Sequence, residues 1–246
     1  MSVDAGRNRN GARPQLTARR RLREFADRDR AVFIQGFFKT GPGQYGEGDQ
    51  FLGLRVPDLR TVAREFRSLP LSDLRNLLQS KWHEERLLAL VILVDRYEGG
   101  DDRERDAIFK LYLGSADCIN NWDLVDCSAP QIVGGHLATR NRKLLYRLAK
   151  SKSVWERRIA LLATFHFIRQ GEFDDSFALA QSLLSDKHDL IHKAAGWMLR
   201  EIGKRDRKVL EEFLSKFGAR MPRTMLRYAI ERFPPARRQR FLTKSS

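Results

Sequence analysis

The sequence has few of the features that mark secreted, membrane or cofactor-binding proteins. Its two cysteines, Cys118 and Cys127, are too few for a disulfide framework, so we expect a reduced, intracellular protein. The longest apolar stretch, Leu87 to Val94, is far shorter than the roughly 18–20 residues of a membrane span. Residues 1–30 hold no apolar segment typical of a secretory signal. We therefore expect a cytoplasmic location and no membrane partner.

Nucleotide-binding and metal-binding motifs are also missing. Neither a Walker A loop nor a dinucleotide-binding glycine fingerprint occurs, so no nucleotide cofactor is expected. The histidines are scattered along the chain. His188 and His192 are four residues apart, but no third ligand is evident near them, so we expect no metal site.

Positive charge is what the sequence has in excess. It holds 46 Lys and Arg against 31 Asp and Glu, a net charge of +15. Such a charge repels itself, and a polyanionic partner is the usual compensation. Nucleic acid is the first candidate and an anionic membrane surface the second; an arginine-rich protein without a special partner is the alternative. Arginines also crowd residues 1–23, where Asp4 is the single acid. We expect a disordered basic tail over residues 1–15, with a mitochondrial presequence as the alternative.

Hydrophobic periodicity predicts an all-α protein. From Leu16 onward, apolar residues recur at intervals of three and four, and strict alternation is absent. Glycines and prolines separate the segments, and the glycine-rich stretch from Thr40 to Gly53 is predicted to be an ordered surface loop. The expected helices are 16–26, 28–39, 56–67, 71–79, 83–98, 102–115, 121–138, 141–150, 153–170, 174–185, 187–203, 206–217 and 222–233.

A repeat of about 36 residues connects these helices. Steps of 36 from Arg86 reach Trp122, Arg158 and Ala194, each near the start of a long predicted helix, with a shorter helix between successive long ones. Such a repeated helical hairpin is typical of a HEAT-like α-solenoid with one continuous core. We therefore expect a single domain over residues 16–241, with the long helices lining its concave face.

The segment Asn120-Asn121-Trp122-Asp123-Leu124-Val125-Asp126 is the most informative. Asn120 or Asn121 can cap the helix that follows. Trp122 and Asp126 are four residues apart and share a helical face. A carboxylate in this apolar neighbourhood is costly unless it faces a groove or has a partner. The alternative is that Asp126 pairs with an arginine of the next repeat and Trp122 simply packs.

Two further segments place basic and aromatic residues on the next long helices. In Trp155-Glu156-Arg157-Arg158, the arginines can be solvated, can pair with Asp126, or can grip phosphate. In Lys193-Ala194-Ala195-Gly196-Trp197, the glycine removes a side chain beside the tryptophan and would let another surface approach. Two tryptophans, a carboxylate and basic residues on adjacent helices suit a cationic sugar or base, because aromatic faces attract positive charge.

These three segments resemble the motifs of the AlkD family of DNA alkylation repair glycosylases, which are HEAT-like repeat proteins. Trp122 to Asp126 is similar to the family's Trp-Asp-x-Val-Asp motif. Trp155 to Ala160 resembles its Trp-x-x-Arg-x-Ala motif, and Lys193 to Glu201 resembles Lys-Ala-x-Gly-Trp-x-Leu-Arg-Glu. The resemblance runs from about residue 30 to residue 233.

The resemblance implies a role for each matched residue. Asp126 would be the catalytic carboxylate, Trp122 and Trp197 would cradle the cationic nucleotide, and Arg158 would contact the DNA backbone, with Arg157 and Lys193 beside it. A tyrosine that the family can place near the lesion looks replaced by Phe37 or Phe38.

The implied activity is base excision repair by a DNA glycosylase. The expected reaction is hydrolysis of the N-glycosidic bond of cationic N3- or N7-alkylated purines in double-stranded DNA, without a flipped-base pocket. We expect a monomer that needs no cofactor and associates with the nucleoid. One alternative is a non-catalytic HEAT-repeat protein that binds damaged or branched DNA. Another is a protein-interaction scaffold, which the net charge of +15 disfavours.

Overall fold

The computed structural model describes residues 14–243, and the chain divides into two compact units, Met1–Ser128 (unit 1) and Ala129–Ser246 (unit 2). The described residues form helices joined by loops, with one isolated bridge between Gln50 and Trp82 and no β-strand in that part of the chain. The predicted all-α class is therefore confirmed. Most of the predicted basic tail, residues 1–13, lies outside the described residues, and the first helix begins at Pro14.

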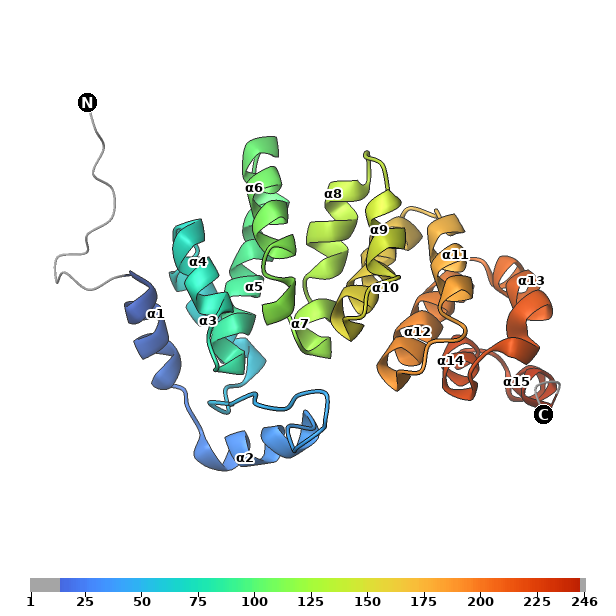
Figure 1. The fold of residues 1–246 in the computed structure, drawn as a ribbon, viewed down its shortest axis with the longest axis horizontal. Coiled ribbons are helices and arrows are strands. Elements are labelled where there is room, and N and C mark those ends of the chain that lie inside the picture. Colours follow the sequence, from blue (N-terminus) through green and yellow to red (C-terminus); the bar gives the residue numbers. More distant parts are fainter. Residues whose placement is uncertain (1–13, 244–246) are drawn as a thin grey trace. The chain divides into compact units, whose positions relative to one another are not determined.

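Unit 1 is built around the helix that begins at His83. Its sequence Leu87 to Val94 is apolar almost all round, which is typical of a helix packed on several sides. Helices α3 (Val56–Glu65), α4 (Leu71–Leu78) and α6 (Asp102–Leu113) pack most closely against it (Figure 1). The helices of this unit are α1 (Pro14–Arg23), α2 (Arg28–Phe37), α3 (Val56–Glu65), α4 (Leu71–Leu78), α5 (His83–Gly99), α6 (Asp102–Leu113), the 3₁₀ turn η1 (Ala116–Cys118) and α7 (Trp122–Asp126).

Helix α2 differs from its neighbours because it buries none of its residues. Val32, Phe33 and Phe37 are all more than half exposed. The chain entering α2 lies tightly against Gly53, whose φ is +83° and where a Cβ atom would come within 2.1 Å of the Asp27 carbonyl oxygen. Only glycine fits that backbone conformation and that contact. Gly53 therefore lets the end of the glycine-rich loop pack closely against the start of α2.

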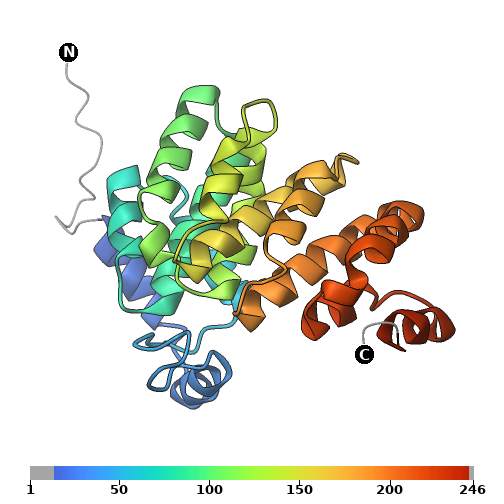
Figure 2. The ribbon, with the colours of Figure 1, turned by 45° about the vertical axis from the view of Figure 1, so that its right-hand side comes forward.

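Unit 2 is built around two long helices, α10 (Val154–Arg169) and α12 (Asp189–Arg205), which pack against each other (Figure 2). Helix α12 also packs closely on α14. A Cβ atom at Gly196 would lie 2.5 Å from the Met225 carbonyl oxygen, so the predicted close approach at this glycine is confirmed and α14 is the approaching surface. The elements of the unit are the π-helix η2 (Pro130–Gly134), α8 (Gly135–Leu137), α9 (Lys143–Leu148), α10 (Val154–Arg169), α11 (Asp174–Ser182), α12 (Asp189–Arg205), α13 (Arg207–Phe217), the 3₁₀ turn η3 (Gly218–Arg220), α14 (Arg223–Ala229) and α15 (Pro235–Thr243).

Two of the helix predictions were wrong. The helix expected over 121–138 is interrupted: α7 ends at Asp126, and a π-helical stretch begins at Pro130. Pro130 has no backbone N–H to donate to the preceding turn, which ends a regular helix. The second error is an omission: no helix is predicted after residue 233, but α15 begins at Pro235, and proline is favoured in the first turn of a helix.

Candidate functional site

Helix α7 is a single turn whose start is fixed by Asn121. The side chain of Asn121 is fully buried, and its Oδ1 atom accepts a hydrogen bond of 2.8 Å from the Trp122 backbone N–H. Its Nδ2 atom donates to Asp49 at 3.1 Å. Of the two asparagines that could cap this helix, Asn121 is therefore the cap, and it also ties α7 to the end of the glycine-rich loop.

Trp122 lies on an aromatic cluster formed by α2 and the loop after it. The ring of Phe38 stacks on Trp122 with centroids 5.2 Å apart and an angle of 12° between the planes. Phe37 meets the same indole edge-on at 6.1 Å and keeps 59% of its surface exposed. Both phenylalanines flagged in the sequence thus contact Trp122, but only Phe38 offers it a parallel ring. Trp122 itself stays half-buried.

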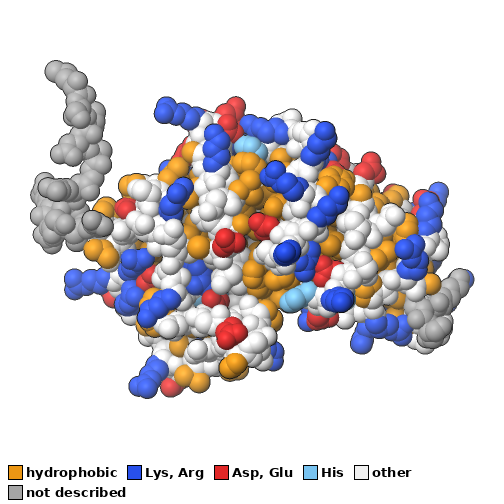
Figure 3. Space-filling view, in the orientation of Figure 1, with side chains coloured by type: hydrophobic (Ala, Val, Ile, Leu, Met, Phe, Trp, Pro, Cys, Tyr) orange, Lys and Arg blue, Asp and Glu red, His pale blue; other side chains and the backbone are white. Residues whose placement is uncertain are grey.

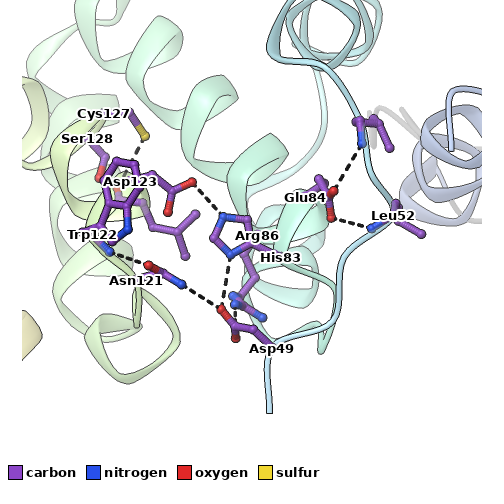
Figure 4. Close-up of polar contacts among 12 residues, drawn as sticks. Asp49, Leu52, His83, Glu84, Arg86, Asn121, Trp122, Asp123, Cys127 and Ser128 are labelled. Carbon is purple, nitrogen blue, oxygen red and sulfur yellow. Dashed lines mark hydrogen bonds and ion pairs between the residues drawn. The ribbon is translucent and has the colours of Figure 1, made fainter. Parts of the chain in front are cut away.

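A buried ionic network, drawn in Figure 4, adjoins this aromatic cluster, because the Phe38 ring lies 5.1 Å from the ring of His83. The His83 ring, 2% exposed, is 2.8 Å from Asp123 through Nε2 and 3.3 Å from Asp49 through Nδ1. Arg86 donates to the other oxygen of Asp49 at 2.6 Å. Burial disfavours the protonated ring, but Asp123 and Asp49 outweigh it and raise the pKa of His83 to about 9.

The same network sets the charge of Asp49. Burial would raise the pKa of this carboxyl, yet hydrogen bonds from His83 and Asn121 and the charge of Arg86 lower it below its usual value. Asp49 is therefore an anion at neutral pH, and His83 is a cation between two carboxylates.

Sequence reasoning missed this network, although the chain carries a signal for it. The residues His83, Glu84, Glu85 and Arg86 open a helix whose next eight residues are all apolar, and all four are buried. Glu84 accepts hydrogen bonds from three consecutive backbone N–H groups, those of residues 52 to 54. Four polar residues at the start of such a helix indicate a buried ionic cluster, because unpaired charges there would be too costly.

Asp126 occupies the last position of α7 and is half-buried beside the fully buried Leu124 and Val125. Its neighbour Cys127 donates a weak hydrogen bond from Sγ to the Leu124 carbonyl oxygen at 3.4 Å. Burial first, and then the charges of Asp123 and Asp126, raise the pKa of the Cys127 thiol to about 12. A thiol that stays protonated at neutral pH is no nucleophile.

In unit 2, Trp197 is positioned by a side-chain hydrogen bond. Its Nε1 atom donates to Glu201, one turn further along α12, at 3.2 Å, and the ring of Phe165 lies 6.0 Å away. Glu201 is buried, which alone would raise its pKa, but hydrogen bonds from Lys204 and Trp197 and the charges of Lys204 and Arg200 lower the pKa below its usual value. The indole is thus held at its edge by an anion, and it remains half-buried.

The basic residues predicted to contact DNA differ in how they are held within unit 2. Arg158 is 5% exposed and donates to the Leu190 carbonyl oxygen at 2.7 Å. Arg157 forms an ion pair with Asp186 at 2.6 Å. Lys193 is more open and pairs with Asp189 one turn before it at 2.8 Å. Arg157 and Arg158 therefore also serve the packing of unit 2.

The predicted site residues fall in both units. Trp122, Asp126 and Phe37 lie together in unit 1, and unit 2 holds Arg157, Arg158, Lys193 and Trp197. On the face drawn in Figure 3, Lys and Arg side chains are spread over both units. Within residues 14–243, no His, Cys, Asp and Glu side chains are grouped as metal ligands, and no helix is both long and apolar enough to cross a membrane.

Comparisons with known proteins connect this arrangement to DNA repair. A search of curated proteins gave no match. The solved structure of a predicted DNA alkylation repair enzyme from Enterococcus faecalis is similar, with a TM-score of 0.65 and 16% identity over 85% of this chain and 97% of that chain. A likeness at this identity shows that the two share a helical fold. The family model of the DNA alkylation repair enzymes matches residues 18–233, which is most of the chain. The protein therefore belongs to the family of DNA alkylation repair enzymes.

Proposed function

We propose that this protein is a DNA glycosylase that hydrolyses the N-glycosidic bond of cationic N3- or N7-alkylated purines in duplex DNA. The observation that carries the proposal is the single turn of α7, which presents the stacked Trp122 and the half-buried Asp126 four residues apart. Membership of the family supports the coarser role in alkylation repair. The net charge of +15 supports a polyanionic partner such as DNA.

Asp126 supplies the chemistry in this proposal. Alkylation at N3 or N7 already places a positive charge on the base, so the base can leave without being protonated first. As the bond between C1′ and nitrogen breaks, its electron pair neutralises the base and the sugar becomes oxocarbenium-like. The Asp126 carboxylate stabilises that sugar cation, and it orients a water that adds to C1′ and gives up its proton to the carboxylate.

Trp122 and Trp197 supply selectivity for the charged lesion. A cation over an indole face gains roughly 0.5–2 kcal/mol, and a neutral base gains none of this. The proposal requires no flipped-base pocket, since the indoles and the carboxylate act on a lesion gripped through its backbone. Arg158, Lys193 and Arg157 would contact phosphate, and Phe37 would contact the DNA near Trp122. Arg157 is expected to contribute least because Asp186 already occupies its guanidinium.

The test measures base release from duplexes carrying N7-methylguanine or N3-methyladenine. The wild-type protein should release both bases above the spontaneous rate, and Asp126→Asn should lose most of that release, about 100-fold or more if removal of one electrostatic stabiliser costs what it does elsewhere. Binding to an undamaged duplex should be unchanged in the variant.

The same assay separates the main alternative, a non-catalytic protein that binds damaged or branched DNA. Tight duplex binding without base release by the wild-type protein would favour that alternative. Equal release by the wild-type protein and Asp126→Asn would show that another group performs the chemistry. A duplex containing only unmodified purines is the substrate control, because a neutral base is a poor leaving group.

A further inference from the structure

The most unusual polar feature of unit 1 is the buried set formed by Asp49, His83, Arg86, Asn121 and Asp123. These residues come from three places: the end of the glycine-rich loop, the first turn of α5, and the start of α7 (Figure 4). The proposed chemistry assigns no role to any of them. All except Asp123 are less than 10% exposed, and Asp123 has one carboxylate oxygen on His83.

The imidazole of His83 has no spare nitrogen. Nε2 faces Asp123 at 2.8 Å and Nδ1 faces Asp49 at 3.3 Å, so each ring nitrogen has a carboxylate acceptor. A ring that donates on both sides must carry both protons and is therefore an imidazolium cation. The charged groups that face it are Asp49 from the loop, Asp123 from α7 and Arg86 from α5. Removing one member of a buried ionic set leaves the others uncompensated, which makes the set act as a whole.

The network holds the residues on both sides of Trp122. Asn121, before the indole, is bonded to Asp49, and Asp123, after it, is bonded to His83. The ring of Phe38 contacts both rings, with its centroid 5.1 Å from that of His83 and 5.2 Å from that of Trp122. The backbone of α7 is thus fixed at both neighbours of the indole, and its aromatic support rests on the same imidazole.

We propose that His83 is a positioning residue for base release: as an imidazolium bridging Asp49 and Asp123, it fixes the turn that carries Trp122 and Asp126. This inference rests on the proposed glycosylase function. It makes base release depend on the protonation of His83, a dependence that Trp122 and Asp126 alone would not have. When His83 loses its proton, one carboxylate loses its donor, the turn loosens, and Asp126 leaves the geometry that the sugar cation needs. The raised pKa of His83, about 9, places this loss on the alkaline side of neutrality.

The experiment measures single-turnover base release from an N7-methylguanine duplex at saturating protein between pH 6 and pH 9.5, with spontaneous release subtracted at each pH. The wild-type rate should fall as pH approaches 9. His83→Gln should be about 10- to 100-fold slower at pH 7, because small misplacements of a catalytic group carry costs of that order. Its rate should no longer fall on the alkaline side, and its affinity for the duplex should be unchanged.

A matched control separates positioning from general destabilisation. His136 is also buried, at 7% exposure, but it lies in unit 2. His136→Gln should keep both the rate and the alkaline fall of the wild-type protein. Asp49→Asn removes one of the two anions and should shift the alkaline fall to lower pH, so it tests the network if His83→Gln does not fold. An unchanged rate and pH profile in His83→Gln, or an unshifted profile in Asp49→Asn, would overturn the proposal.

Two readouts do not depend on any enzymatic activity. Nuclear magnetic resonance should show the His83 ring titrating near pH 9, and amide hydrogen exchange at pH 7 should be faster over residues 121–127 in His83→Gln than in the wild-type protein. If the wild-type protein releases no base, the proposed function fails while these readouts still report whether the network holds the turn. An ordinary titration near pH 6.5 together with unchanged exchange would contradict the positioning role.

Discussion

The two units hold their candidate-site tryptophans, Trp122 in unit 1 and Trp197 in unit 2, in different ways. In unit 1, Trp122 lies face to face with Phe38 and its backbone is fixed by buried charges around His83. In unit 2, Trp197 is held at its indole edge by Glu201, whose other partners are partly exposed basic side chains. A stacked ring depends on shape and on the turn beneath it, whereas an edge hydrogen bond depends on one anion. The same residue type at two candidate positions is therefore sensitive to different perturbations.

The difference extends to pH. His83 has a folded-state pKa above its unfolded value, so its contribution to stability is fully present below about pH 6.5 and is lost as pH rises through about 9. Glu201 has a lowered pKa, so its contribution is present above its unfolded value and is lost as pH falls through the folded one. Unit 1 thus loses stability between about pH 6.5 and 9. In unit 2, the histidines with a shifted pKa, His166 and His188, have it lowered, so they add no such loss.

The largest effect is expected from breaking the packing of unit 2 without touching its charges. Gly196→Val places a side chain against the Met225 carbonyl oxygen and the Tyr228 side chain, both 2.5 Å from the Cβ position. Overpacking of this kind typically costs about 1–3 kcal/mol, and we expect the upper end because backbone is in the way. Thermal unfolding measured by circular dichroism would report it. Gly218→Ala is the control, since no atom lies within 4 Å of its Cβ position; equal losses in both variants would contradict the packing argument.

Conservative replacement should separate the two tryptophans. Trp122→Phe keeps a ring on Phe38 and should retain base release within about threefold of wild type, while Trp197→Phe loses its bond to Glu201 and should fall about tenfold, near the 1.4 kcal/mol of an ordinary hydrogen bond. Trp122→Ala and Trp197→Ala give the rate of base release that remains when each aromatic ring is absent. The comparison between the units would fail if phenylalanine rescued both positions equally.

The acid side of the pH comparison is tested by Glu201→Gln. Glutamine can still accept from the Trp197 indole but carries no charge, so the variant should lose less stability than the wild-type protein as pH falls from about 5 to 3. Chemical denaturation at several pH values measures this slope. Glu212→Gln, an exposed glutamate of α13, is the control because it makes the same change of side chain at the surface. Parallel pH slopes for Glu201→Gln and the wild-type protein would show that Glu201 does not carry the acid sensitivity.

The smallest effect concerns salt. Lys193→Ala removes one partly exposed cation paired with Asp189, so duplex binding should weaken slightly and the slope of log affinity against log salt should decrease by about one. Lys216→Ala, at the end of α13, changes the net charge equally and serves as the control. A slope that changed equally in both variants would mean that Lys193 acts only through net charge.

Local rules predicted much of the fold and little of the network. Spacing of apolar residues located most helices, and small side chains marked the close approach at Gly196. The partners of His83 are 34 and 40 residues away in the sequence, one of them in a loop without periodicity, so no local pattern connects them. Their proximity depends on how α5 packs and on where the glycine-rich loop returns. The prediction of a continuous helix over 121–138 was wrong because it followed the apolar periodicity and neglected Pro130.

The shared acceptor at Asp49 has a consequence for how this sequence can change. One carboxylate serves three donors, His83, Arg86 and Asn121, which come from two different helix starts. Substitutions at these four positions should be strongly non-additive, because the first loss leaves the remaining groups buried without partners and the later losses remove groups that no longer contribute. These positions should therefore change together in evolution. Relatives that lack an acid at the position of Asp49 are expected to have replaced His83 and Asn121 as well.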